Sequence, residues 1–133
     1  VQEAIAYIKN FYSQKITVED IADYLALNRS YLYTIFMNSL GISPKDFLTK
    51  FRISRGKEKL TLTDLSVEEI AVSCGYRNSF AFGKVFKQQM GMTPTQYRND
   101  NRRAARERLI RAQNELKEYK KHKTIYVGDI EKE

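Results

Sequence analysis

The stretch TVEDIADYLALNRSYLYTIFMNSLGISPKDF at residues 17–47 returns as SVEEIAVSCGYRNSFAFGKVFKQQMGMTPTQY at residues 66–97, and this repeat decides the fold. The two copies align at an offset of 49 residues up to Leu25 and Cys74, and at 50 from Asn28 and Asn78 onward. The second copy therefore holds one extra residue before its middle helix. An internal repeat of this length indicates a duplicated structural unit.

Each copy carries start and stop signals for three helices. A small polar residue whose side-chain oxygen can cap free backbone amides stands at every expected helix start. These residues are Thr17, Asn28 and Ser43 in the first copy, and Ser66, Asn78 and Thr93 in the second. Gly41 and Gly91 are placed to end the middle helices, and Pro44 and Pro94 suit the first position of the next ones. Apolar residues recur at helical spacing in both copies, so the sequence predicts an all-α fold with two helix-turn-helix subdomains.

The rest of the chain joins or extends these units. We expect a leading amphipathic helix at residues 3–12 and a linker helix from Asp46 to about Leu60, interrupted by a tolerated or close-packed Gly56 rather than a hinge. The predicted organisation is a first subdomain at 1–45, a linker helix and connection at 46–63, a second subdomain at 64–99 and a basic charged tail at 100–133.

Composition limits the classes of function. The 133 residues carry a net charge of +7, which favours a polyanionic partner. The single cysteine, Cys74, occupies a core position, and the single histidine, His122, lies in the tail. The sequence therefore predicts no catalytic residues, no metal site, no cofactor and no enzyme. No apolar run approaches the ~20 residues that span a bilayer. We expect a protein of the cytoplasm with no membrane partner, and the missing initiator methionine suggests a fragment.

The second helix of a helix-turn-helix enters the major groove of DNA, with its first residues at base edges. On each recognition helix, the positions outside the apolar core stripe face outward, and we expect these residues to contact DNA. They are Arg29, Ser30, Tyr33 and Thr34, with Met37 at the margin, in the first copy, and Asn78, Ser79, Phe80, Gly83, Lys84 and Lys87 in the second. The alternative is that these residues are the ordinary solvated faces of a helical bundle.

Basic residues outside the recognition helices are candidates for binding the phosphate backbone, which fixes register without reading sequence. The expected phosphate contacts are Lys45, Lys50, Arg55 and Arg98, with Lys57 and Lys87 as further candidates. Each of them can equally be a solvated surface charge.

The second copy, read through to Arg98, resembles the C-terminal signature of the AraC/XylS transcription regulators. The matching residues are Ile70, Ala71, Gly75, Tyr76, Phe82, Phe86, Lys87, Gly91, Thr93, Pro94, Tyr97 and Arg98. The first copy matches the family's other unit through Ile21, Ala22, Ser30, Tyr31, Leu32, Phe36, Gly41, Ser43, Pro44 and Phe47. Arg52 and Ile53 match its linker helix, and the resemblance covers about residues 3–99.

The resemblance implies a monomeric unit of seven helices that binds double-stranded promoter DNA sequence-specifically, with two recognition helices in successive major-groove segments. It also implies a bacterial, nucleoid-associated regulator. We expect an activator that recruits RNA polymerase and dimerises through a missing N-terminal domain.

The second copy departs from the family pattern where its recognition helix begins. The family often has Ser-Tyr-Phe-Ser-Arg there, and this chain has Phe80-Ala81-Phe82-Gly83-Lys84. Lysine is a point charge that cannot bind guanine as a planar fork. These departures favour base reading by the first unit and backbone contact by the second.

The tail lies outside the repeat. We expect a charged helix from Asn101 to Lys121, followed by an extended or disordered end. A stripe with coiled-coil spacing, too short to be more than marginal, consists of Ala105, Leu109, Ala112, Leu116 and Tyr119. A solvated helix, packing on the domain, self-association and extra phosphate contacts all remain open for it. Two functions compete with specific DNA binding for the whole chain: a helical module that docks an acidic protein, and a non-specific DNA binder.

Overall fold

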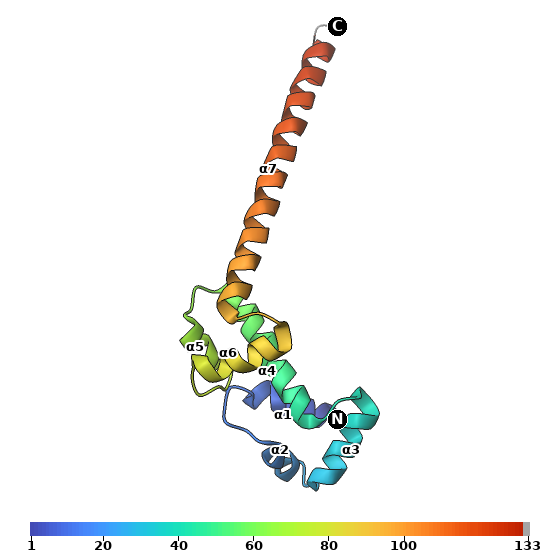
Figure 1. The fold of residues 1–133 in the computed structure, drawn as a ribbon. Helices are drawn as coiled ribbons and strands as arrows, with labels where there is room; N and C mark the ends of the chain where they lie inside the picture. Colours follow the sequence, from blue (N-terminus) through green and yellow to red (C-terminus); the bar gives the residue numbers. More distant parts are fainter. Residues whose placement is uncertain (132–133) are drawn as a thin grey trace. The chain divides into compact units, whose positions relative to one another are not determined.

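Seven helices build the chain in the computed structural model, which describes the backbone of residues 1–131 and the side chains of residues 1–122 (Figure 1). No strand occurs in that described backbone. The helices are α1 (Gln2–Phe11), α2 (Val18–Tyr24), α3 (Arg29–Leu40), α4 (Pro44–Leu62), α5 (Val67–Ser73), α6 (Ser79–Met90) and α7 (Pro94–Glu131). The predicted all-α fold with duplicated helix-turn-helix units is confirmed.

The helix caps follow the sequence signals. The Thr17 hydroxyl accepts a hydrogen bond from the backbone N–H of Asp20, whose carboxylate accepts one from the N–H of Thr17, which completes a capping box. The side-chain oxygens of Asn28 and Asn78 cap α3 and α6 through the N–H groups three residues on. These local bonds fix where each helix of the repeat begins.

The two middle helices also end as the sequence predicts. Gly41 and Gly91 adopt φ angles of 72° and 74°, in the left-handed region that a residue without Cβ enters at little cost. Pro44 and Pro94 then open α4 and α7. The repeat in sequence is thus a repeat in backbone geometry.

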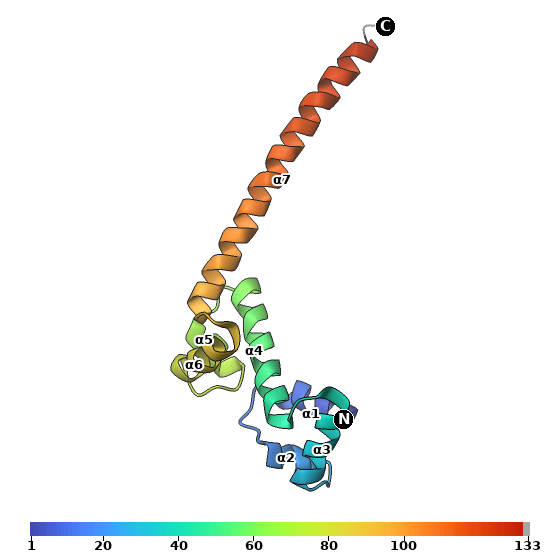
Figure 2. The same cartoon turned by 45° about the vertical axis from the view of Figure 1, so that its right-hand side comes forward.

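Helix α4 runs through both halves of the domain, with α1, α2 and α3 around its first part and α5 and α6 around its second (Figures 1 and 2). The first core contains Ala4, Ile8, Ile21, Ala22, Leu32, Phe36 and Leu48. The second contains Ile53, Leu60, Ile70, Ala71, Cys74, Phe82 and Phe86. Because α4 supplies residues to both cores, it is a structural part of each subdomain and not a tether between them. The burial of Cys74, which raises the pKa of its thiol, agrees with the predicted core role.

Gly56 of α4 packs directly against Phe82 of α6. A Cβ atom built on Gly56 would lie 2.7 Å from Cζ of Phe82, a ring that is fully buried. Glycine is therefore required by packing, and the prediction of a tolerated or close-packed glycine is confirmed.

Two arginines tie the loops that precede the helix-turn-helix units. The Arg52 guanidinium donates to the backbone carbonyls of Tyr12 at 3.0 Å and Gln14 at 2.8 Å, in the loop after α1. The Arg98 guanidinium donates to the carbonyls of Leu60 at 3.0 Å and Thr63 at 3.3 Å, at the end of α4. Each bond joins residues at least 35 positions apart in sequence. Each arginine thereby donates to backbone carbonyls at the end of a helix or in the loop that follows it.

The tail is not a separate helix. The residues from Val1 to Arg98 form one compact unit and the described residues from Asn99 onward another, yet α7 begins in the first and continues through the second to Glu131. The expected end near Lys121 and the expected extended stretch at 123–131 are therefore wrong. Residues 132–133 lie outside the described residues. The physical reason is that no proline or glycine occurs between Pro94 and position 128 to stop the helix.

Candidate nucleic-acid interface

The first recognition helix, α3, presents the polar face that the sequence predicts. Leu32 and Phe36 are fully buried against the first core. On the opposite side, Arg29, Ser30, Tyr33, Thr34 and Met37 are all exposed. The prediction that these side chains face outward is confirmed, while their contact with DNA stays a prediction.

Two details of α3 go beyond the sequence prediction. The hydroxyl of Thr34 donates to the backbone carbonyl of Ser30 at 3.0 Å, so toward a ligand Thr34 offers its methyl group and oxygen lone pairs but not a proton. Tyr31 is 54% exposed near the start of the same helix and adds an aromatic hydroxyl that the outward set omits. Tyr31 is not one of the core positions of α3, so the sequence pattern could have placed it among the outward residues.

The second recognition helix, α6, presents a different surface. Phe80 is 81% exposed and Lys84 and Lys87 are also exposed. Asn78, Ser79 and Gly83 are only half-exposed. The Asn78 side chain is already engaged as the helix cap, where its oxygen accepts from the N–H of Ala81 at 2.9 Å. Asn78 and Ser79, named as outward residues, are therefore less available than predicted.

A carboxylate stands at the start of both recognition helices. In the first unit, Glu19 pairs with the guanidinium of Arg29 at 3.5 Å, with both side chains well exposed. In the second unit, Glu68 accepts a hydrogen bond from the backbone N–H of Ser79 at 2.8 Å. The two acids are 49 residues apart and occupy the same place in the repeat, and each orients the helix that follows. The bonds from Ser79 lower the pKa of Glu68, so it is ionised at neutral pH.

The phosphate candidates divide into available and engaged side chains. Lys45 and Lys50 are exposed on α4. Arg55 instead pairs with Glu58 at 2.9 Å and lies over the ring of Phe51, 5.0 Å from its centroid. Arg98 holds the loop carbonyls described above. The structure gives Arg55 and Arg98 structural partners, and leaves the two lysines as the better phosphate candidates.

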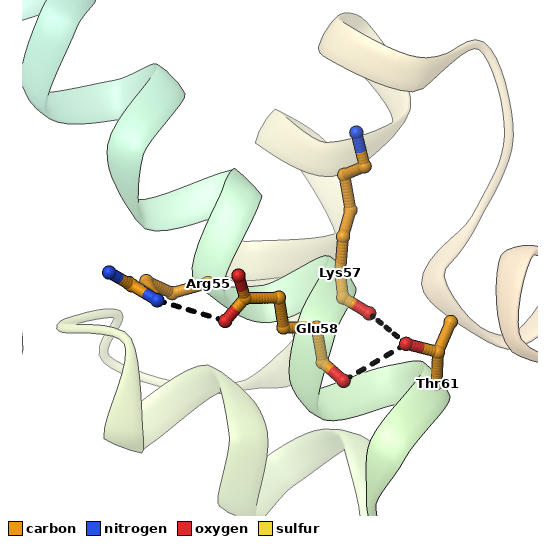
Figure 3. Close-up of polar contacts among 4 residues, drawn as sticks. All are labelled: Arg55, Lys57, Glu58 and Thr61. Carbon is orange, nitrogen blue, oxygen red and sulfur yellow. Dashed lines mark hydrogen bonds and ion pairs between the residues drawn. The ribbon is translucent and has the colours of Figure 1, made fainter.

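Lys57 is half-buried, unlike the exposed Lys45 and Lys50. Figure 3 shows the Arg55 guanidinium directed at Glu58, while the Lys57 side chain extends from another side of α4. The backbone carbonyls of Lys57 and Glu58 accept from the hydroxyl of Thr61 at 3.2 and 3.0 Å. Lys57 shares a shallow cleft with Lys50 and Gln89, between α4 and the end of α6.

A larger surface cleft, of about 450 Å³, lies beside the first recognition helix. Its lining includes the basic residues Arg29, Lys45 and Arg52, together with the carboxylate of Glu19. The structure thus brings one predicted base-contact residue and one predicted phosphate contact to the same cleft. Three basic side chains against one carboxylate leave an excess of positive charge, which suits a phosphate group.

Other kinds of site find no support in the described part of the chain. Within residues 1–122, no three histidine, cysteine, aspartate or glutamate side chains are placed to hold a metal ion. Among the described helices, none combines the length and the hydropathy of a membrane-spanning segment.

The chain is similar to DNA-binding proteins over its two repeats. Residues 21–100 match a family model described as a helix-turn-helix domain. The raffinose operon transcriptional regulatory protein RafR of Pediococcus pentosaceus is 42% identical over 95 residues, which are 71% of this chain and 34% of RafR. The chain spans about a third of the length of such curated relatives.

Solved structures show the same likeness. The C-terminal domain of AraT, a response regulator from Geobacillus stearothermophilus, superposes with a TM-score of 0.72 at 37% identity, covering 74% of this chain and 83% of that one. The DNA-binding domain of AdpA, a global transcriptional factor solved in complex with a target DNA, superposes with a TM-score of 0.74 at 27% identity. That match covers 77% of this chain and 93% of the AdpA domain.

Proposed function

The chain belongs to the AraC/XylS family of transcription regulators, and from this premise we propose that residues 1–98 bind promoter DNA sequence-specifically through α3 and α6. The observation that carries the proposal is the pair of capped recognition helices, each with a buried apolar side and an exposed polar or basic side. The two helices enter successive major-groove segments about 34 Å apart, one turn of the duplex. The AdpA domain, similar in fold, was solved with a target DNA, which supports this mode of binding.

Helices α3 and α6 contribute unequally to the recognition of base sequence. Helix α3 offers a guanidinium, tyrosine hydroxyls and a threonine methyl group, which are groups that can distinguish base edges. Helix α6 offers Phe80, two lysines and the bare backbone at Gly83. Lys84 and Lys87 bind phosphate as point charges, and Phe80 meets a thymine methyl at most. The first unit therefore supplies most of the sequence discrimination.

Phosphate contacts fix the protein on the duplex. We assign them to Lys45 and Lys50 on α4, with Lys57 beside the end of α6. Lys45 lines the same cleft as Arg29, so a phosphate bound there holds the start of α3 close to the base edges. Such contacts strengthen binding without selecting sequence.

The whole protein is proposed to act as a transcription activator in the bacterial cytoplasm. The curated relatives include regulators named for raffinose, melibiose and lactose operons, the last of them named as an activator. By the same family likeness we propose RNA polymerase as a partner and dimerisation through another domain. The DNA-binding domain itself acts as a monomer.

The test is binding to a library of random duplexes long enough for two major-groove segments, measured at several salt concentrations. We expect enrichment of one sequence and affinity that falls steeply with salt. The variant Ser30→Glu/Thr34→Glu/Lys84→Glu should lose binding while its circular dichroism stays that of a folded protein. A matched control, Gln2→Glu/Lys9→Glu/Asn10→Glu, makes the same charge change on exposed positions of α1 and should retain sequence-selective binding.

Two outcomes would reject the proposal. Binding without sequence preference at every salt concentration would identify a non-specific DNA binder. Unchanged binding of an acidic protein partner by the recognition-helix variant, with no DNA binding by the parent protein, would favour the docking module.

A further inference from the structure

The first half of the tail carries an unusual concentration of arginine. Residues 102–111 read RRAARERLIR, with five arginines and one glutamate, so this segment holds +4 in ten residues. The following described residues, 112–122, hold three lysines and two glutamates, or +1. The excess charge of the tail is therefore concentrated in the part that follows the DNA-binding unit directly, and it comes from arginine.

Four of the five arginines carry a charge that no carboxylate among the described side chains neutralises. Arg103, Arg106, Arg108 and Arg111 are all exposed, and none of them forms an ion pair within the described side chains. Glu107 lies four positions from both Arg103 and Arg111, at a spacing that permits pairing on a helix, and still forms no ion pair with either in the described residues. Their charge is thus available to an external anion.

The arginines cover a broad part of the helix surface. At ~100° per residue, positions 103, 106, 108 and 111 spread over about 200° of its circumference, so a polyanion that lies along this side of the helix meets several of them. The segment is ~14 Å long, a length over which duplex DNA carries about eight phosphates. Arginine binds phosphate as a planar fork and is weakly hydrated, which suits it to this contact better than lysine.

We propose that residues 102–111 form a second, sequence-independent contact with the phosphate backbone of the DNA that the helix-turn-helix units bind. The proposal rests on the function proposed above. The contact adds affinity without altering which sequence is preferred. It also gives a role to part of the chain that follows the compact unit.

The experiment compares two variants of the full chain with equal charge changes. The first is Arg103→Gln/Arg106→Gln/Arg108→Gln, and the matched control is Lys117→Gln/Lys120→Gln/Lys121→Gln. Glutamine keeps helix propensity near that of arginine and lysine, so circular dichroism should show unchanged helix content in both. The measurement is the dependence of DNA affinity on salt for one selected duplex and one scrambled duplex.

We expect the plot of log K against log salt to become less steep in the arginine variant, with the magnitude of its slope reduced by about 2–3. The affinity at physiological salt should fall by about tenfold to a hundredfold, on both duplexes alike. The control should stay close to the parent protein. A third variant with lysine at the same three positions should recover most of the slope, since the charges return.

Specific binding with an unchanged slope in the arginine variant would overturn this proposal and leave the proposed function intact. Equal losses in the arginine variant and its control would also overturn it, because the effect would then be that of net charge alone. Absence of DNA binding by the parent protein would reject the proposed function and this contact together.

Discussion

The carboxylate of Glu68 accepts a hydrogen bond from the backbone N–H of Ser79 at 2.8 Å, which ties α5 to the first residue of the second recognition helix. In the first unit the equivalent acid, Glu19, reaches the side chain of Arg29 instead. The same position of the repeat thus orients both recognition helices by different bonds. Glu68 occupies an amide at the start of α6 that could otherwise bind a phosphate, whereas Glu19 engages only the side chain of Arg29.

Glu68 should make stability depend on pH. Its pKa is lowered in the folded protein, so the bond to Ser79 stabilises the fold above the pKa of the unfolded chain, and this contribution is lost as the pH falls through the folded pKa. The free energy of unfolding should therefore decrease from about pH 4.5 downward more steeply in the parent protein than in Glu68→Gln. Urea denaturation at a series of pH values measures the difference, and parallel curves would contradict the assignment.

Gly56→Ala should destabilise the fold by about 1–3 kcal/mol, because the new methyl group meets the buried ring of Phe82 at 2.7 Å. This cost exceeds the gain of up to ~1 kcal/mol in helix propensity. Gly83→Ala is the matched control, since a Cβ there meets nothing nearer than Cδ of Pro94 at 4.0 Å. That control should gain stability in denaturant titrations, and equal effects of the two substitutions would contradict the packing argument.

Arg52→Ala should cost about 1.5–3 kcal/mol, since it removes charge-assisted hydrogen bonds to the carbonyls of Tyr12 and Gln14. Arg77→Ala, which removes an exposed arginine, should stay within about 0.5 kcal/mol of the parent protein. Chemical denaturation measures both. A small effect at Arg52 would show that water satisfies these carbonyls equally well.

Glu19→Gln should strengthen DNA binding several-fold at low salt, because it releases Arg29 and removes a negative charge beside α3. The gain should shrink as salt screens the interaction. Asp23→Gln is a suitable control, since Asp23 is an exposed acid on α2, as Glu19 is, and forms no ion pair with α3 among the described side chains. Fluorescence anisotropy with a selected duplex measures the DNA affinity of both variants. Equal gains in affinity would show that the change in net charge, and not the release of Arg29, causes the effect.

Local signals accounted for most of the fold. Thr17, Asn28 and Gly41, with their counterparts in the second copy, act within three or four residues, so the sequence shows both partners of each bond together. The outward sides of α3 and α6 followed from the same helical spacing. Arg52 and Arg98 escaped prediction because their acceptors lie 35–40 residues away and are backbone carbonyls, which leave no mark on the sequence.

The course of the tail was missed for a different reason. No proline or glycine between Pro94 and Gly128 signals an end of the helix, so the boundary expected near Lys121 rested on composition alone. The exposed stripe through Leu109, Leu116 and Tyr119 has the spacing of a coiled coil, and nothing within the described side chains covers it.

Helix α4 contributes Leu48 to the first core and Leu60 to the second, so the two recognition helices are held at one separation. Moving them apart would require α4 to break and a core to open. The spacing between the two halves of an operator for this protein is then constrained more strictly than the base sequence of either half. A base change in one half costs the contacts at that base alone, whereas inserting half a helical turn between the halves turns the second one to the far side of the duplex and leaves α6 with no groove to enter.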